Sequence, residues 1–289
     1  MQDEIVARLA GALNAQFVAA EARRAEQAAN PDSIDFYFQG LAWFNKGRTP
    51  DNIAQAHSFF DRALAADPAN VDALVGSGIA EAVEAANSFV TDATVALSAA
   101  EAKFTRALSS VPDHALAHLH LGVLYIWTKR GAQGVAKCEH ALALDRNLAG
   151  AHALIGYGRM FMGYAEETEA HIAEALRLSP RDTMAYLWMG YAGVAKVGLR
   201  DYEQADAWCR RAIEANRNDP QPHFVLAAAL AQLGRLDEAH SAVKAGLALS
   251  PAFTVSRTRD AWSAMSDVPI YLIGLERIFD GMRKAGVPE

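Results

Sequence analysis

Three histidines close together are the best metal-binding candidates in the sequence: His114, His118 and His120. His114 and His118 are four residues apart, so on a helix they would share one face, as zinc-binding histidines do. His118, however, occupies a position that recurs along the chain, and its other occupants are Leu74, His152, Tyr186 and His223. A position that accepts imidazole, phenol and aliphatic side chains favours a half-buried structural role. We therefore predict no metal ligand here.

The carboxylates of Glu166, Glu167 and Glu169 are the next candidates, in this case for acid–base catalysis. They stand at the start of an expected helix, where the helix dipole stabilises negative charge. The string GYGRMFMG at 156–163 contains glycines but lacks the preceding strand that a phosphate-binding loop needs. The sequence has no G-x-S-x-G motif and no Cys/His pair with an orienting acid. We predict no catalytic residue, no cofactor-binding residue and no enzymatic activity.

The two cysteines, Cys138 and Cys209, are candidates for a disulfide or a reactive thiol. Both occupy a position that Phe60 and Phe104 fill elsewhere in the chain. A position shared with phenylalanine is typical of a buried core site, where a free thiol acts as a small hydrophobic side chain. The cysteines lie two structural repeats apart, which is too far for a disulfide if the repeats are stacked helix pairs.

These positions recur because the chain is built from repeats. Within His114–Pro180, two similar strings are offset by 34 residues, so that Gly122 matches Gly156 and Leu142 matches Leu176. A period of 34 residues with two helical segments per unit is the signature of the tetratricopeptide repeat. The pattern predicts an all-α fold, a right-handed α-solenoid of antiparallel helix pairs with about six repeats and helical caps at both ends.

The expected array has three parts. Residues 1–30 form an N-terminal capping or linker helix with an apolar stripe, and residues 31–251 form the repeats. Residues 252–289 form C-terminal capping helices, and Asn30–Ser33 separates the first two parts. One repeat is longer, because Pro68 and Pro112 are 44 residues apart. We expect the ten extra residues, around Asn87–Ser98, to form longer helices or a protruding elbow. In the N-terminal helix over residues 1–30, the apolar stripe consists of Ile5, Leu9, Leu13 and Phe17.

The apolar content and the charge of the chain exclude several classes of function. The chain has 289 residues, of which 52% are hydrophobic and 21% charged, and its net charge is −7. This apolar content is sufficient for a large core. An acidic chain without a basic stripe is not expected to bind nucleic acid. The longest charge-free blocks, such as Met184–Val194, are too short to span a bilayer, and the charged start is unlike a secretory signal. We expect a cytoplasmic protein without a membrane partner.

The first helix of each repeat is expected to line a concave groove, and the residues there are largely apolar with interleaved tyrosines. Such a groove fits an amphipathic helix or an extended apolar segment of a protein partner. It lacks the Lys, Arg and Asn residues that clamp a terminal carboxylate in chaperone-binding arrays. Two alternatives stay open: the groove is covered, by the chain's own first or last helix or by a tight superhelical curl, or the groove mediates homodimerisation. The predicted groove residues are Val75, Ile79, Leu116, Leu119, Val123, Ile126, Tyr157, Met160, Leu187, Tyr191, Val194 and Phe224.

Several strings are more specific than the generic repeat, among them EARRAEQAANPDSIDFYFQGLAWFNKG, CEHALALDRNLAGAHALIG and YLIGLERIFDGMRKAGVPE. Together they resemble the C-terminal repeat region of proteobacterial, rhizobial-type class III adenylate/guanylate cyclase-like signalling proteins. Some members of that family carry a winged-helix head in place of the cyclase. The resemblance implies a sensory or regulatory interaction module. No strand pattern of a cyclase domain occurs here, so no catalytic residue is transferred. The alternative is a part of a nucleotide cyclase whose catalytic domain is absent from this sequence.

Overall fold

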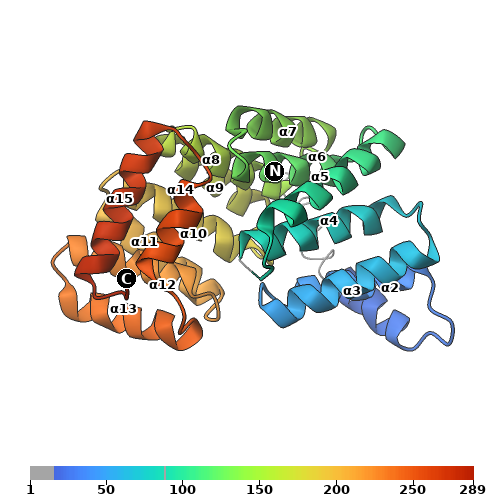
Figure 1. Ribbon diagram of the computed structural model, residues 1–289, viewed down its shortest axis with the longest axis horizontal. Coiled ribbons are helices and arrows are strands. Elements are labelled where there is room, and N and C mark those ends of the chain that lie inside the picture. The colour runs from blue at the N-terminus through green and yellow to red at the C-terminus, as the bar shows by residue number, and fades with distance from the viewer. Residues whose placement is uncertain (1–15, 88) are drawn as a thin grey trace. The chain divides into compact units, whose positions relative to one another are not determined.

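A computed structural model describes residues 16–87 and 89–289, and within these residues every regular element is a helix (Figure 1). Residues 16–26 are helical, whereas Ile5, Leu9 and Leu13 of the predicted first helix lie outside the described residues. The predicted fold class, an α-solenoid of antiparallel helix pairs, is confirmed. The further helices are α2 (Ser33–Phe44), α3 (Pro50–Ala66), α4 (Val71–Ala86), α5 (Ala93–Ser110), α6 (Ala115–Trp127), α7 (Gly131–Leu144), α8 (Ala149–Phe161), α9 (Ala165–Leu178), α10 (Ala185–Gly198), α11 (Tyr202–Ala215), α12 (Gln221–Gln232), α13 (Leu236–Leu249), α14 (Val255–Ser263) and α15 (Pro269–Lys284).

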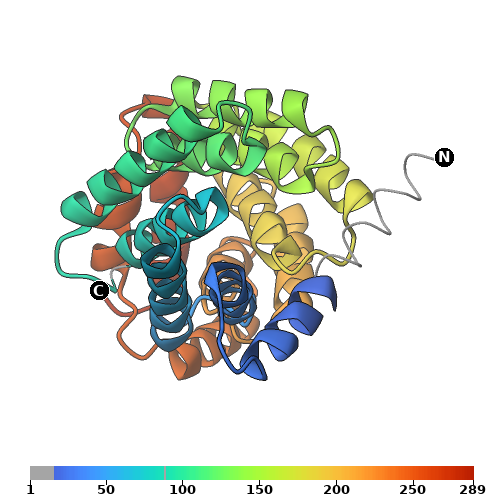
Figure 2. The ribbon, with the colours of Figure 1, turned by 90° about the vertical axis from the view of Figure 1, so that its right-hand side faces the viewer.

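The chain divides into two compact units. Unit one comprises the residues up to Leu124 together with Ala136–Leu148, and unit two comprises Tyr125–Val135 and Ala149–Glu289. The hairpins α2/α3 and α4/α5 belong to unit one, and α8/α9, α10/α11 and α12/α13 belong to unit two (Figure 2). The predicted boundaries at residues 30 and 251 stay a prediction.

Unit one is held together by large rings that fill gaps left by glycines. Phe60 of α3 is 1% exposed and lies between Gly40 of α2 and Gly76 of α4. A Cβ atom at these glycines would stand only 2.6 and 2.7 Å from the phenyl ring. The glycines are therefore needed for three helices to close around one ring, and the burial of that ring stabilises both the hairpin and its stacking on the next one.

Helix starts in this unit are capped by polar side chains. Asp32 accepts hydrogen bonds from the backbone N–H groups of Ile34 and Asp35, and the Asp35 carboxylate accepts one from the backbone of Asp32. This reciprocal capping box begins α2 directly after the predicted break at Asn30–Ser33. Thr49, Asn70 and Asp92 cap α3, α4 and α5 in the same manner, each through its side-chain oxygen.

The ten extra residues of the second repeat lengthen its helices. Helix α4 has 16 residues and α5 has 18, against 13 in α8 and 14 in α9 of a standard repeat. The remaining three residues extend the connection between the two helices, which runs over 87–92. The prediction of elongated helices at Asn87–Ser98 is thus confirmed.

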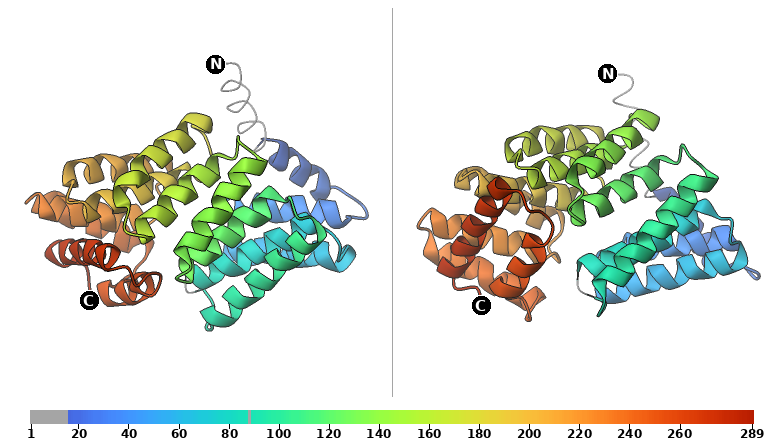
Figure 3. Two further views of the ribbon diagram at one scale, coloured as in Figure 1. Left: turned by 90° about the horizontal axis from the view of Figure 1, so that it is seen from above. Right: turned by 45° about the horizontal axis from the view of Figure 1, so that its top comes forward.

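In unit two, α8, α10 and α12 lie in a row, and each is paired with the second helix of its own hairpin. Gly193 of α10 faces Cys209 of α11, with 2.6 Å between a Cβ built at the glycine and the Cys209 Sγ. In the last hairpin the glycine lies on the second helix instead of the first, because Phe224 of α12 packs against Gly246 of α13. After α13 the chain forms α14 and α15, and α15 lies beside α12 and α10 (Figure 3).

None of the helices in the described residues is both long and apolar enough to cross a membrane.

Two glycines of α10 allow a matched test of the close approach between hairpin helices. Gly193→Ala should lower the melting temperature, because its Cβ meets the buried Cys209 Sγ and overpacking costs about 1–3 kcal/mol. Gly190→Ala should raise or preserve it, since nothing lies within 4 Å of its Cβ and alanine gains up to about 1 kcal/mol of helix propensity. Circular dichroism melts of the two variants measure the difference. Equal shifts would contradict this account of the hairpin.

Candidate functional site

The three histidines that could form a metal site do not converge. His114 caps α6, because its Nδ1 accepts from the backbone N–H of Ala117 and its Nε2 lies 3.1 Å from Asp72. The His118 Nε2 donates to the Pro112 carbonyl at 2.8 Å, and its ring meets His140 edge-on. His120 stacks on Phe104 instead. Within residues 16–87 and 89–289, no three His, Cys, Asp or Glu side chains gather in a geometry that could hold a metal ion.

The three glutamates at the start of α9 have structural partners or lie in solvent. Glu166 and Glu167 stand in the first turn, as predicted from the helix dipole. Glu169 binds the Lys196 ammonium at 2.7 Å and accepts from the Trp208 indole N–H at 3.1 Å. The hydrogen bond from Lys196 holds the pKa of Glu169 below its ordinary value. A carboxylate held ionised by a neighbouring cation is poorly suited to donate a proton at neutral pH.

The two thiols are buried in separate second helices, and both are free cysteines. Burial raises the pKa of Cys138 to about 12 and also raises the pKa of Cys209. Because the thiolate is the reactive form, neither side chain has the character of a nucleophile. Glycines 156 and 158 of the GYGRMFMG string are likewise packing residues within α8, facing His171 and Val135.

The predicted groove residues occupy very different environments. In unit one, Val75, Leu119 and Val123 are buried, Ile79 is half-buried, and Leu116 is 38% exposed. In unit two, Ile126, Met160 and Phe224 are buried in the core, whereas Tyr157, Leu187, Tyr191 and Val194 are half-buried. Only the exposed and half-buried members are accessible to a partner in this structure. Ile126 lies near the end of α6, and the other unit-two members lie on α8, α10 and α12. We call the surface of α8, α10 and α12 that carries these members the first-helix face.

The first-helix face is partly occupied by the chain's own last helix. Helix α15 packs on α10 and α12 through Leu275, Ile278, Phe279 and Met282, which are at most 2% exposed. A Cβ at Gly281 of α15 would come within 2.6 Å of the Ala228 carbonyl oxygen of α12, so the two helices are in backbone contact there. The last helix was one of the candidates for covering the groove, and it does cover part of this face.

Polar contacts fix where α15 lies. The Ser266 hydroxyl donates to the Phe161 carbonyl at 2.8 Å, and the Arg277 guanidinium donates to the Gly198 carbonyl. These carbonyls stand at the C-terminal ends of α8 and α10, where helix carbonyls have no partner within the helix. Gln232, at the end of α12, donates to the Arg277 carbonyl and accepts from Lys284. The α14–α15 segment therefore contacts the ends of three successive first helices.

An aromatic cluster joins the first-helix face to α15. The rings of Tyr157 and Tyr191 lie 4.2 Å apart, and Tyr157 also meets Phe161 edge-on at 4.7 Å. Phe161 stacks on Tyr271 of α15 at 4.6 Å. The indole N–H of Trp127 donates to the Tyr157 hydroxyl at 3.3 Å. Tyr157 and Tyr191 occupy the same position in consecutive repeats, so the 34-residue period itself brings the two rings together.

Beside this cluster lies an apolar pocket of about 190 Å³ between the end of α8, the end of α10 and α15. Its rim carries Leu199, Ile270 and Ile273, which are 42%, 67% and 54% exposed. We call it the notch, and define it by Gly163, Glu166, Leu199, Ile270, Ile273 and Arg277. The sequence reasoning missed it, although one signal was present: α15 carries isoleucines both on its buried side and on its exposed side.

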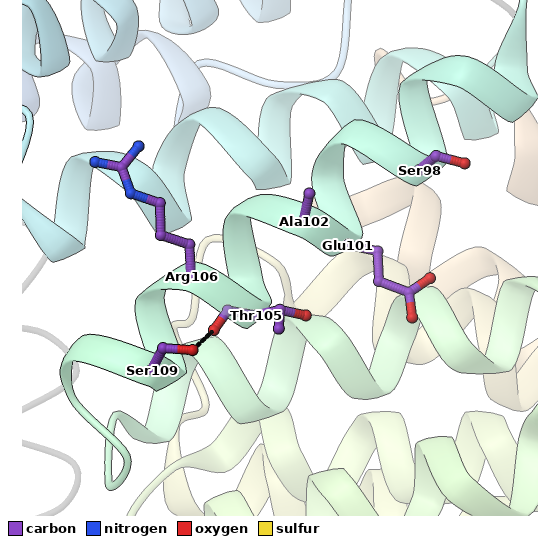
Figure 4. Close-up of a pocket in the computed structure, with 6 residues that line it drawn as sticks. All are labelled: Ser98, Glu101, Ala102, Thr105, Arg106 and Ser109. Carbon is purple, nitrogen blue, oxygen red and sulfur yellow. Dashed lines mark hydrogen bonds between the residues drawn. The ribbon is translucent and has the colours of Figure 1, made fainter.

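Two larger depressions lie in unit one and show no convergent chemistry. The groove along α5 is lined by Ser98, Ala102, Thr105, Ser109, Glu101 and Arg106 (Figure 4). Its arginine donates to the Pro68 carbonyl, and its Ser109 hydroxyl donates to the Thr105 carbonyl. A second depression borders His57, whose Nδ1 lies 3.2 Å from Glu84. The Arg106 and His57 side chains in these depressions are thus already bound by other groups of the protein.

Comparison with known proteins agrees with this architecture. Residues 186–219 match the family model of the tetratricopeptide repeat. The fold is similar to a chain of the Cut9–Hcn1 heterotetramer of the APC/C, with a TM-score of 0.67 and 15% identity over 90% of this chain and 47% of that one. It is also similar to human IFIT1, solved as a dimer with m7Gppp-AAAA, with a TM-score of 0.67 and 16% identity over 91% and 64%.

A third similar structure is PilF of Pseudomonas aeruginosa, with a TM-score of 0.52 and 16% identity over 76% of this chain and 93% of that one. The chain spans about half the length of the Cut9–Hcn1 chain and less than two thirds of IFIT1. No curated protein matches the sequence. The repeat match and the fold together assign a tetratricopeptide repeat architecture.

One buried and three half-buried histidines predict a loss of stability in weak acid. Burial lowers the pKa of His118, His152 and His223, and lowers that of His120 from 6.5 to about 3. Below pH 6.5 these histidines are protonated in the unfolded chain but stay neutral in the folded chain. The free energy of unfolding therefore decreases as the pH falls below 6.5. For His120 the loss should reach about 2 kcal/mol near pH 5.

Urea unfolding at about pH 7.5 and about pH 5 measures this loss. The His120→Gln variant should lose less stability between the two pH values than the wild type, because glutamine does not titrate. An equal loss in both proteins would contradict the assignment of His120 as a ring that stays neutral in the folded chain.

Proposed function

We propose that this chain is a non-catalytic protein-interaction scaffold that binds an apolar or amphipathic partner segment on the first-helix face of unit two. The observation that supports the proposal most directly is the docking of α15. This face already holds one amphipathic helix through Leu275, Ile278 and Phe279, so its shape and chemistry suit such a segment. The half-buried Tyr157, Leu187 and Tyr191 extend the same face beyond the part that α15 occupies.

The partner segment is proposed to lie beside α15 and not to replace it. Each fully buried large apolar side chain contributes about 1.5–3 kcal/mol. Removal of Leu275, Ile278, Phe279 and Met282 from the core would therefore cost roughly 6–12 kcal/mol, which is as much as a tight complex gains. Addition of a segment along Leu187 and Tyr191 leaves that burial intact.

The charges on this face argue for an apolar partner segment and against a terminal carboxylate. Lys196 is the lysine of α10, and its ammonium binds Glu169 at 2.7 Å and Asp201 at 3.2 Å. A cation that is already neutralised by two carboxylates attracts a third only weakly. Tyrosines, by contrast, offer a large apolar ring together with a polar edge, as binding surfaces commonly do.

The finer role that we propose is the regulatory or sensory module of a bacterial cyclase-like signalling protein. Its support is the resemblance of strings such as CEHALALDRNLAGAHALIG and YLIGLERIFDGMRKAGVPE to the repeat region of class III cyclase-like proteins. The scaffold would then transmit the binding of a partner to a separate cyclase or winged-helix head. A chain of helix pairs suits this role because each pair contacts only its neighbours and presents a continuous surface.

Site-specific photocrosslinking in the source cell tests the proposal. A photoreactive side chain at position 187 of α10 should form an adduct with a protein partner, whereas the same side chain at position 249 of α13 should not. Leu187 and Leu249 both reach the surface of unit two, but they belong to the first and the second helix of their hairpins. The Tyr191→Asp substitution should reduce the adduct at 187 by at least about tenfold, as expected for a central contact residue.

Identical adducts at positions 187 and 249 would exclude this face as the binding site. Loss of helicity in the Tyr191→Asp variant would show that the ring is needed for the core, and Leu187→Asp then replaces it in the experiment. Mass spectrometry of the adduct tests the finer role. A partner with a cyclase-like or winged-helix head would support that role, and an unrelated partner would contradict it while the scaffold function stands.

A further inference from the structure

We propose that a second copy of this chain binds at the notch, so that two chains form a symmetric dimer through α15 and the ends of α8 and α10. Ile270 and Ile273 are on one exposed side of α15, three residues apart, and Leu199 stands opposite them. Solvent-exposed aliphatic side chains gathered around a pocket are typical of a protein-binding surface. The pocket shares Met160 and Val194 with the first-helix face but includes neither Leu187 nor Tyr191, where the partner segment is proposed to bind.

The notch provides both a projection and a recess. Ile270 is 67% exposed and Ile273 54% exposed, so both side chains extend into solvent. The recess beside them measures about 190 Å³ and is lined by apolar atoms of α10 and α15. Apolar cavities of about 150 Å³ accommodate a molecule of the size of benzene, so this recess has room for one branched aliphatic side chain. A twofold axis through such a surface places the projection of each copy in the recess of the other.

The charges at the notch are also self-complementary. Glu166, in the first turn of α9, and Arg277, on α15, both line it. Neither forms an ion pair with any described residue, although Arg277 donates to the Gly198 carbonyl. In a twofold arrangement Glu166 of one copy faces Arg277 of the other, and the pair occurs twice. This complementarity favours a second copy over an unrelated partner, because the same surface supplies both the anion and the cation.

The dimer is expected to be weak and reversible. Stable specific interfaces bury roughly 1,200–2,000 Å² in total, whereas the notch involves two turns of α15 and two helix ends. Sedimentation velocity over a range of concentrations should therefore show a monomer–dimer equilibrium of the full chain. Ile273→Glu should raise the dissociation constant at least about tenfold by placing a charge in the apolar centre. Leu249→Glu, a matched change at the 40% exposed leucine of α13, should leave it unchanged.

A charge exchange distinguishes this dimer from any other association. Glu166→Arg and Arg277→Glu should each weaken self-association, because each places like charges opposite one another. Mixing the two variants should restore a dimer, since one side of the mixed pair then joins the introduced arginine to the introduced glutamate, and the other side keeps the original Glu166 opposite the original Arg277. Circular dichroism checks that both variants are folded, and the double variant in one chain, which should self-associate again, serves if Arg277→Glu alone is unstable.

A wild-type chain that stays monomeric at the highest soluble concentration would overturn the proposal. A dimer that persists unchanged in Ile273→Glu, or that charge exchange fails to restore, would overturn it as well. These results are independent of the partner segment, because position 187 lies outside the notch. An adduct at position 187 without self-association would leave the scaffold function intact and remove only the dimer.

Discussion

The structure depends on a steric constraint between packed helices, where a side chain on one helix meets a glycine on its neighbour, both within hairpins and between them. Phe60 packs against Gly40 and Gly76, and at a Cβ distance of 2.6–2.7 Å no other residue fits at either glycine without displacing the ring. In the last hairpin the large ring lies on the first helix and the glycine on the second, as with Phe224 and Gly246. Either order works because the total side-chain volume at the contact is what must fit. Close approach within hairpins then brings successive first helices side by side, which creates the first-helix face.

That face is apolar, and a helix array cannot leave it fully exposed at low cost. In unit two the chain resolves this with α15, which buries Phe279 and Met282 completely and satisfies carbonyls at the ends of α8 and α10 through Ser266 and Arg277. The two kinds of contact act together, because apolar burial supplies most of the free energy while the directional hydrogen bonds fix the position of the helix. The surface left beside α15 is smaller and more aromatic than an open groove would be.

The titratable groups that could have carried chemistry serve this architecture instead. His118 donates to the Pro112 carbonyl, Glu169 joins Lys196 to Trp208, and the Cys138 thiol is held protonated by burial. Each contributes to packing or to a helix end, and each is held in one protonation state at neutral pH. The accessible members of the first-helix face are consequently the half-buried Tyr157, Leu187, Tyr191 and Val194, which are apolar or aromatic.

The sequence by itself determined the repeat architecture, since the 34-residue period, the glycine positions and the Pro68–Pro112 spacing depend on local pattern and recur along the chain. It also indicated structural roles for His118 and for the two cysteines, because each shares its position with aromatic or aliphatic residues. Only the tertiary structure decided which groove residues are accessible, as the difference between buried Phe224 and half-buried Tyr191 shows. The physical reason is that α15 occurs once in the chain and contacts residues more than a hundred positions earlier, such as Phe161, on which Tyr271 stacks. A contact that occurs once cannot be predicted from the repeat period. An amphipathic last helix has the same apolar pattern whether it caps the end of an array or lies across its face.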